Sequence, residues 1–209
     1  MSKFSKRLSK QLQRRWLLAK LQGSENANRI KKLDADIHTQ YEHTISPFVV
    51  DMAGFTARAR DFGILHYLAM VEMMRSTLTP LVEAGGGTVV KVEADNLFGH
   101  FKTPSAALRT IGKIGKSLRK LNDDIDDAHR IELSIGVGYG PTLLTQEDMW
   151  GSDFNLSCKL GEDIAQTGEV LFSESARRKI RTRKVNFEER SFVGVGQVVT
   201  AHSVQIASL

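Results

Sequence analysis

Apolar residues recur at two different periods along this chain of 209 residues. Spacings of three and four residues predict helices, over residues 2–22, 27–41, 64–84, 104–124, 151–165 and 173–180. Short apolar or alternating runs predict strands, over residues 48–52, 131–140 and 169–172, with hairpins over 88–101 and 185–204. Residues 141–145 are expected to be a return strand paired with 131–140. Because hairpins are frequent and no strict βαβ rhythm appears, the pattern indicates an α+β or mixed-sheet α/β protein.

Charge divides the chain into two parts. The net charge is +5, but residues 1–34 hold ten Lys or Arg against only Glu25 and Asp34, and the remainder is nearly neutral. We therefore predict a basic helical extension over 1–45 and a domain over 46–209. The single cysteine, Cys158, excludes an intramolecular disulfide and a cysteine-cluster zinc site, which fits a cytoplasmic protein. The sequence has no run of eighteen apolar residues for a transmembrane helix.

The first predicted helix, within residues 1–22, mixes apolar positions with basic ones. Such a helix can contact an anionic membrane surface, a nucleic acid or a partner helix. It can also simply pack on its own domain or on a dimer mate, which is the more common role of a basic helical face and the one the sequence favours. We expect no nucleic acid as a partner, and membrane contact is the less favoured alternative.

Three groups of polar residues are candidates for chemistry. Asp51 ends an apolar strand and Asp95 lies at the predicted hairpin tip; each is also an ordinary choice for a turn or helix cap. Two carboxylates at adjacent strand ends can bridge two hard cations about 3.5–4 Å apart. Lys91, four residues before Asp95, shares its face if the strand stays regular. Asn155 and Lys159 share a helix face and can hold a phosphate oxygen.

The segments VVDMAGFT, KVEAD and EDMWGSDFN, with a later lysine, resemble in their order the motifs of the class III nucleotidyl cyclase catalytic domain. The resemblance covers about residues 46–206. It implies a mixed, mainly antiparallel sheet with a ferredoxin-like core, flanked by helices. It also implies a head-to-tail homodimer with active sites between the two chains, in which Asp51 and Asp95 hold two Mg²⁺ or Mn²⁺ ions.

The same resemblance implies roles for the other candidates. The backbone around Ala53, Gly54 and Phe55 would cradle the substrate phosphates. Lys91 would donate to adenine N1, and Asp148 would accept from the 6-amino group.

Asn155 would orient the ribose, and Lys159 stands where the family usually has Arg. A lysine keeps the positive charge but lacks the bidentate fork of arginine. Ala94 replaces the usual Gly of the KxxGD motif, and residues 193–196 lack the lysine that the family often has in its last hairpin.

Together these features predict an adenylate cyclase, a lyase that converts ATP to 3′,5′-cyclic AMP and pyrophosphate. A cyclase for a guanine or pyrimidine nucleotide is one alternative, and it should not need the pair of Lys91 and Asp148. A non-catalytic nucleotide-binding module is another, with Lys159 as its best argument. An adaptor that works through residues 1–34 alone is the third.

Overall fold

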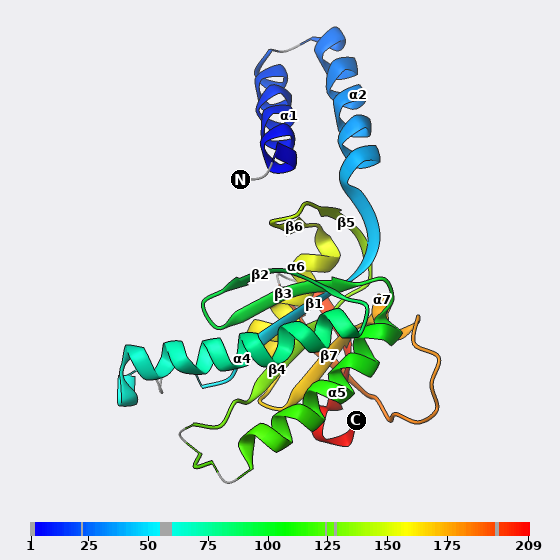
Figure 1. The fold of residues 1–209 in the computed structure, drawn as a ribbon. Helices are drawn as coiled ribbons and strands as arrows, with labels where there is room; N and C mark the ends of the chain where they lie inside the picture. Colours follow the sequence, from blue (N-terminus) through cyan, green and yellow to red (C-terminus); the bar gives the residue numbers. More distant parts are fainter. Residues whose placement is uncertain (1–2, 22, 55–59, 124, 128, 195–196) are drawn as a thin grey trace.

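A nine-stranded sheet forms the centre of the computed structural model, which describes residues 3–21, 23–54, 60–123, 125–127, 129–194 and 197–209. Seven strands follow the order β2-β3-β1-β4-β7-β9-β8, and β5 and β6 continue from β1 (Figure 1). All pairs are antiparallel except β4 with β7, so the sheet is mixed and mainly antiparallel, as expected. The strands are β1 Glu42–Met52, β2 Thr88–Glu93, β3 Asn96–Phe101, β4 Leu133–Val137, β5 Gly140–Leu144, β6 Met149–Trp150, β7 Glu169–Ser173, β8 Glu188–Gly194 and β9 Gln197–Gln205.

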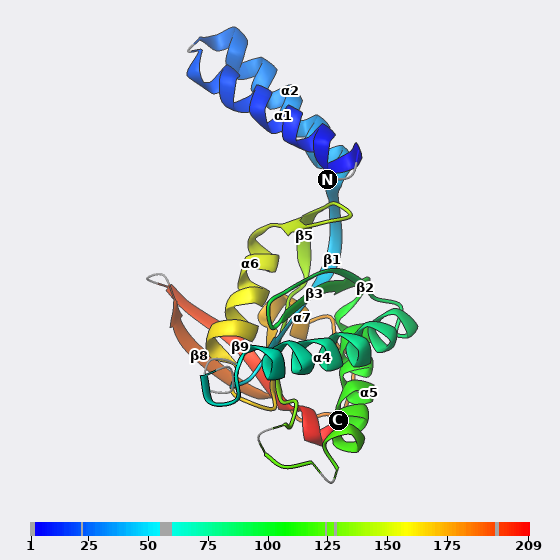
Figure 2. The same ribbon diagram turned by 60° about the vertical axis from the view of Figure 1, so that its left-hand side comes forward.

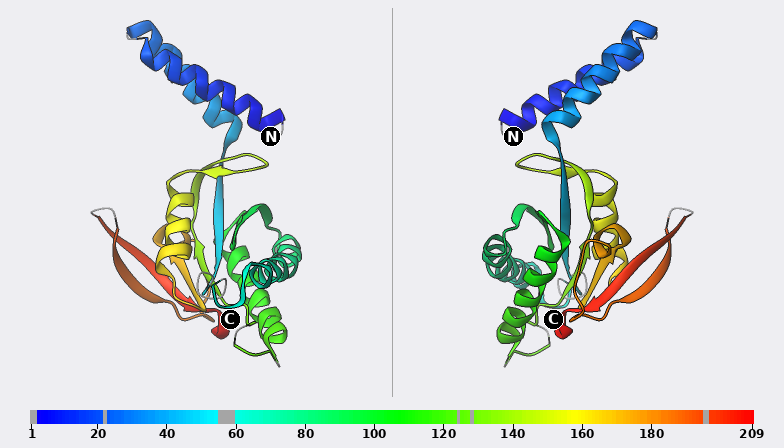
Figure 3. Two further views of the ribbon diagram at one scale, coloured as in Figure 1. Left: turned by 90° about the vertical axis from the view of Figure 1, so that its left-hand side faces the viewer. Right: turned by 90° about the vertical axis from the view of Figure 1, so that its right-hand side faces the viewer.

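Helices cover both faces of this sheet. The helices α4 and α5 lie on one face and α6 lies on the other, as the edge-on views of Figure 3 show. Thr103 caps α5, where its side chain accepts from the Ala106 amide and Pro104 takes the first helical position. The helices are α1 Lys3–Lys20, α2 Ser24–Tyr41, α4 Ile64–Ala84, α5 Pro104–Asn122, α6 Ser152–Cys158, the π-helix η1 Lys159–Ile164, α7 Glu174–Arg177 and the 3₁₀ helix η2 Ile206–Ser208.

The central strand β1 is buried on both faces, and its alternation decides where its last residues point. Phe48 and Val50 belong to the core beneath α4 and α5, whereas Val49 packs with Phe154 of α6 on the opposite face. Because side chains along a strand alternate, Asp51 lies on the Val49 side, toward α6 and η1.

The structure differs from the sequence prediction in a strand boundary, a strand pairing and a helix type. β1 begins at Glu42, six residues before the expected strand, because its first residues pair with β5. The strand β5 pairs with β1 and β6, so the expected pairing with the 131–140 strand is wrong. The helix expected over 151–165 is an α-helix followed by a π-helix. The predicted division at residue 45 stays a prediction, and β1 runs across it.

The helices α1 and α2 form an antiparallel hairpin that projects from the sheet, with its turn at the far end (Figures 1 and 2). Leu8 of α1 packs on Leu33, Ile37 and Tyr41 of α2, and Leu143 of β5 joins this cluster. None of the helices that the structure describes is both long and apolar enough to cross a membrane.

Candidate active site

Two carboxylates meet where three strands end. Asp51 is near the end of β1, opposite Asn96 of β3, and Asp95 lies in the turn between β2 and β3. The backbone amide of Met52 donates to the Asp95 carbonyl oxygen at 3.2 Å, which ties this turn to β1. The antiparallel pairing of β1 and β3 therefore brings the two acids side by side although they are far apart in the sequence.

The environment of Asp51 disfavours its negative charge. Burial, followed by the charges of Asp95 and Glu162, raises the pKa of Asp51 to about 6, and a hydrogen bond from Ser134 opposes this. The Ser134 hydroxyl donates to Asp51 Oδ2 at 3.5 Å. With its amide nitrogen turned toward the acceptors, Asn96 donates to Asp51 Oδ1 at 3.0 Å. Burial also raises the pKa of Asp95.

Glu162 is an acidic neighbour of this pair that sequence reasoning missed. It lies on the π-helix η1, and burial, followed by the charge of Asp163, raises its pKa. The charge of Asp95 acts on it in the same direction. Its position depends on η1, which the helical period of the sequence does not distinguish from an ordinary α-helix. The sequence therefore carries no local signal for this contact.

The chemistry of the donor set fits a hard divalent cation. Asp51 and Asp95 supply carboxylate oxygens, which Mg²⁺ prefers, and their mutual repulsion would be relieved by positive charge. In the part of the chain that the structure describes, no group of three or more His, Cys, Asp or Glu residues is placed to hold a metal. Mg²⁺ commonly uses only one or two carboxylates and completes its shell with water and substrate phosphates. Two carboxylates are therefore a sufficient protein contribution.

The structure joins Lys91 and Asp148 in one ion pair. Lys91 Nζ lies 3.2 Å from Asp148 Oδ1 and 3.1 Å from Glu93 Oε2. Burial acts to lower the pKa of Lys91, but hydrogen bonds with Glu93 and Asp148 outweigh it and raise the pKa. Asp148 is held by its own turn, because Oδ1 accepts from the Met149 amide at 2.8 Å. Both groups are only partly exposed and are fixed in direction before any ligand binds.

The condition for Lys91 and Asp95 to share a face, a regular strand between them, is not met. The strand β2 ends at Glu93, and Ala94 has a φ of 53°, in the left-handed region. A left-handed residue reverses the chain locally and is easiest for glycine. Lys91 is also next to an irregularity in the β2–β3 register. The replacement of glycine by Ala94 thus falls where a side chain carries strain.

The predicted phosphate cradle is described only in part. The Ala53 amide donates to the Glu132 carbonyl at 2.9 Å, and Gly54 has a φ of 79°, a turn conformation that favours glycine. Phe55 lies outside the described residues. The role of this segment stays a prediction.

Asn155 and Lys159 are carried by α6 and the start of η1. Asn155 is exposed, and Lys159 is partly exposed, with Nζ 3.2 Å from Asp163 Oδ2. This carboxylate partner of Lys159 was not expected from the sequence. Because both side chains face solvent in a single chain, they are available to a second molecule.

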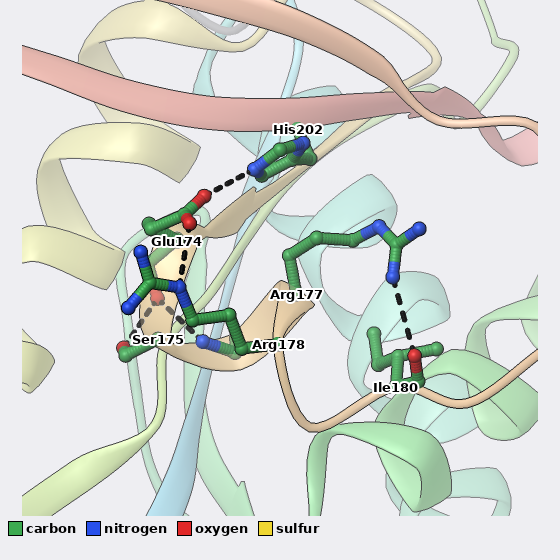
Figure 4. A network of polar contacts seen from close by, with 8 residues as sticks. Glu174, Ser175, Arg177, Arg178, Ile180 and His202 are labelled. Carbon is green, nitrogen blue, oxygen red and sulfur yellow. Dashed lines mark hydrogen bonds and ion pairs between the residues drawn. The ribbon is translucent and has the colours of Figure 1, made fainter.

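A network of polar side chains connects α7 with β9 and with α6. Figure 4 shows Glu174 of α7 between His202 of β9 and Arg178. Glu174 Oε1 accepts from Arg178 Nε at 2.7 Å, and Oε2 contacts His202 Nε2. Next to it, Ser175 donates to Asp153 Oδ1 at 3.2 Å. These contacts connect α7 and β9 to the first turn of the helix that carries Asn155.

Several solved nucleotidyl cyclases share this arrangement of strands and helices. The guanylyl cyclase Cya2 superimposes with a TM-score of 0.69, at 16% identity, over 78% of this chain and 91% of that chain. An adenylate/guanylate cyclase/hydrolase from Silicibacter pomeroyi gives 0.65 at 23% identity, over 78% and 96%. A bacterial light-regulated adenylyl cyclase gives 0.69 at 18% identity, over 79% and 53%. The chain therefore has the fold of the class III nucleotidyl cyclase catalytic domain, which confirms the predicted fold.

The curated relatives are much longer than this chain. "Putative adenylate cyclase 3" of Rhizobium meliloti is 25% identical over 124 residues, which are 59% of this chain and 21% of that protein. "Serine/threonine-protein kinase pkn2" of Myxococcus xanthus is 24% identical over 131 residues, 63% of this chain and 16% of that protein. The chain thus spans about a fifth of the length of these relatives or less. No family model matches the sequence.

Proposed function

We propose that this protein is an adenylate cyclase that converts ATP to 3′,5′-cyclic AMP and pyrophosphate. The observation that carries the proposal is the pairing of Lys91 with Asp148 at 3.2 Å in a domain whose fold also brings Asp51 and Asp95 together. The name of the Rhizobium meliloti relative supports the same activity. The two groups of residues correspond to the two tasks of such an enzyme, reading the base and holding the phosphates.

Base reading follows from the donor and acceptor pattern of the pair. Lys91 offers only N–H donors, and the Asp148 carboxylate offers only acceptors. Adenine presents an acceptor at N1 and a donor at its 6-amino group, so it matches a lysine beside an aspartate. Guanine presents the opposite pattern at these two positions. Because the ion pair holds both groups within 3.2 Å of each other, the base would enter against a preformed donor and acceptor.

The reaction forms a bond from the ribose 3′-oxygen to the α-phosphorus and breaks the bond from that phosphorus to the bridging oxygen of pyrophosphate. The 3′-hydroxyl loses its proton, and pyrophosphate leaves with the electron pair. Asp51 and Asp95 would hold two Mg²⁺ or Mn²⁺ ions. These ions would lower the pKa of the 3′-hydroxyl and neutralise negative charge on the phosphates. Asn155 would orient the ribose, and Lys159 would stabilise charge on the α-phosphate.

The site would be completed by a second copy of the chain. In this homodimer, Asp51 and Asp95 come from one protomer, and the base-reading pair, Asn155 and Lys159 come from the other. The exposure of Asn155 on α6 and the partial exposure of Lys159 at the start of η1 support this division.

Two alternatives rest on specific observations. Several solved structures with this fold carry the name guanylyl cyclase, and one is in complex with GTP. The ion pair of Lys159 with Asp163 favours a module that binds nucleotide without turnover, because Asp163 lowers the charge that Lys159 offers to a phosphate.

One experiment distinguishes an adenylate cyclase, a guanylyl cyclase and a module that binds nucleotide without turnover. The purified protein is incubated with Mn²⁺ and each of ATP, GTP, CTP and UTP, and the products are identified by mass spectrometry, with the Asp95→Ala variant as the control. We expect cyclic AMP and pyrophosphate from ATP, and none from the variant. Cyclic GMP as the main product would contradict the base assignment, and nucleotide binding without any product would contradict the enzyme.

A further inference from the structure

The hairpin of α1 and α2 takes no part in the proposed reaction. The sequence favoured packing of this helix on its own domain or a dimer mate, and the structure packs α1 on α2 around Leu8. The distal end, where α1 ends and the chain turns back, points away from the sheet (Figures 1 and 3). That end is placed to meet another surface without covering the catalytic domain.

The charge of α1 has one sign. Its 18 residues contain no Asp or Glu, and its basic residues are Lys3, Lys6, Arg7, Lys10, Arg14, Arg15 and Lys20. Four of them line one side of a groove of about 540 Å³ between the two helices, namely Lys6, Arg7, Lys10 and Arg14. In contrast, α2 carries acidic and basic residues in balance, and its Asp34 pairs with Arg15 at 2.6 Å. The surface that α1 offers is thus strongly cationic.

Large apolar side chains are exposed at the distal end of the same helix. Trp16 is 58% exposed, Leu17 is 56% exposed and Leu21, just past the helix, is 59% exposed. Lys20 lies over the Trp16 ring, with Nζ 4.0 Å from its centroid. Exposed tryptophan and leucine beside lysine and arginine are typical of helices that lie at a membrane interface.

We propose that the distal end of this hairpin docks on a bilayer surface that contains anionic lipid. Trp16, Leu17 and Leu21 would enter the boundary between headgroups and acyl chains, and Arg14 and Lys20, basic residues of α1 near that end, would contact lipid phosphates. A second copy is a poorer partner, because two α1 helices of the same charge repel each other. A nucleic acid would satisfy the charges but would leave the two leucines without apolar contacts.

The test uses the full chain and intrinsic fluorescence. The protein has two tryptophans, Trp16 and Trp150, so Trp150→Phe leaves Trp16 as the only reporter. We expect its emission to shift to shorter wavelength, and the protein to sediment, with vesicles of phosphatidylcholine and phosphatidylglycerol. Vesicles of phosphatidylcholine alone should have little effect. Binding should weaken more than about tenfold as salt rises from about 0.1 M to about 0.5 M, because added salt screens the charges. This readout does not depend on cyclase activity.

Variants separate the apolar contribution from the charge. Leu17→Ser with Leu21→Ser should weaken vesicle binding by about tenfold or more, since two leucines lose their burial in the interface. Leu65→Ser is the matched control, because Leu65 is 79% exposed on α4, outside the hairpin, and should leave vesicle binding unchanged. All these residues are exposed, so circular dichroism should show an intact fold in each variant.

Several results would overturn the proposal. One is an absence of vesicle binding, and another is equal binding to neutral and anionic vesicles. A short DNA duplex that shifts Trp16 emission as strongly as the anionic vesicles at equal salt would identify a nucleic acid surface instead. If the double leucine variant loses its dimer but keeps its vesicle binding, the distal end is an interface between two copies of the chain.

Discussion

Asp51 shows how a single residue combines fold and function. Its place at the end of a buried strand makes its carboxylate costly to ionise, and its pKa is raised to about 6 by burial and by Asp95 and Glu162. Such a group is more stable protonated in the folded protein than in the unfolded chain, where its pKa is near 3.8. Its contribution to stability is therefore greatest below about pH 4 and is lost as the pH rises through about 6.

This predicts a pH-dependent effect of Asp51→Asn in metal-free protein. At about pH 8 the variant should be more stable than the wild type by about 1–2 kcal/mol, a value reduced from the full shift because solvent screens part of the repulsion. At about pH 4, where folded Asp51 is neutral, the gain should disappear. Urea unfolding of the wild type and the variant at both pH values measures this difference in the free energy of unfolding.

Asp127→Asn is the control for this comparison, because Asp127 is 92% exposed at its side chain. It should change stability little at either pH. Adding Mn²⁺ at about pH 8 should stabilise the wild type and not Asp51→Asn, since ligands that bind the folded state stabilise it. If Asp51→Asn stabilises the protein equally at both pH values, the negative charge of Asp51 does not destabilise the fold.

The proposed base recognition by Lys91 and Asp148 gives a second prediction for single residues. Lys91→Glu removes the proposed donor for adenine N1 and places a carboxylate beside Asp148. We expect kcat/KM for ATP to fall by about 5- to 150-fold, the equivalent of about 1–3 kcal/mol for a lost polar partner, and the preference for ATP over GTP to relax.

Glu93→Gln is the matched control, because it removes the negative charge of the other partner of Lys91 and keeps the contact with Asp148. It should keep the preference for ATP. Steady-state kinetics with both nucleotides decide the matter. If Lys91→Glu keeps the preference of the wild type between ATP and GTP, Lys91 and Asp148 do not recognise the base.

At the scale of the elements, α6 is positioned by glycines that let it approach the sheet. A β-carbon at Gly136 of β4 would lie 2.0 Å from the Ser157 carbonyl oxygen and 2.6 Å from the Gly161 amide nitrogen. Both are backbone atoms, so the helix itself would have to move. The side chains of Asn155 and Lys159 depend on this close packing, because they are carried by α6 and η1.

Gly136→Ala should therefore lower both stability and activity, by about 2 kcal/mol or more in the free energy of unfolding. Gly112→Ala is the matched control within α5, where the added carbon would lie 3.4 Å from the nearest neighbour. In a helix interior this change should stabilise the protein by about 0.5–1 kcal/mol. Chemical denaturation of both variants is the measurement. A Gly136→Ala protein as stable as the wild type would contradict the packing argument.

These elements also mark the limit of prediction from sequence. The hairpin around Asp95 and the helices of the core followed from local periods, because their turn residues and apolar faces are local signals. The early start of β1 depends on the pairing of Glu42 with Leu143, and the π-helix lies where Gly161 packs close to Gly136. Neither distant contact leaves a local pattern, and Glu162 was missed for the same reason.

The structure places several of the predicted site residues next to one another, and their roles stay predictions. Asp51 and Asp95 were chosen from their places at a strand end and a hairpin tip, and Lys91 and Asp148 from motif order; the structure brings each pair together. The ion pair of Lys159 with Asp163 follows from a spacing of four residues and could have been found in the sequence. The roles of Asn155 and Lys159 stay predictions, because they concern a second molecule.

At the scale of the whole molecule, the proposal requires two chains for one site. Closed twofold symmetry gives each homodimer two equivalent sites, each built from both protomers. Asp95→Ala disables the metal half of a site, and Asn155→Ala disables the half that faces it. A mixed dimer of the two variants would gather both defects in one site and leave the other site whole.

Mixing the two variants therefore tests this geometry. Random exchange of equal amounts makes about half of the dimers mixed, and each mixed dimer has one intact site of two. Activity should recover to about a quarter of wild type per chain if the sites act independently. Cyclic AMP production after mixing is the measurement, and subunit exchange is followed by fluorescence transfer between labelled chains. If exchange occurs and activity does not return, the metal carboxylates and Asn155 act within one chain, and the composite site is wrong.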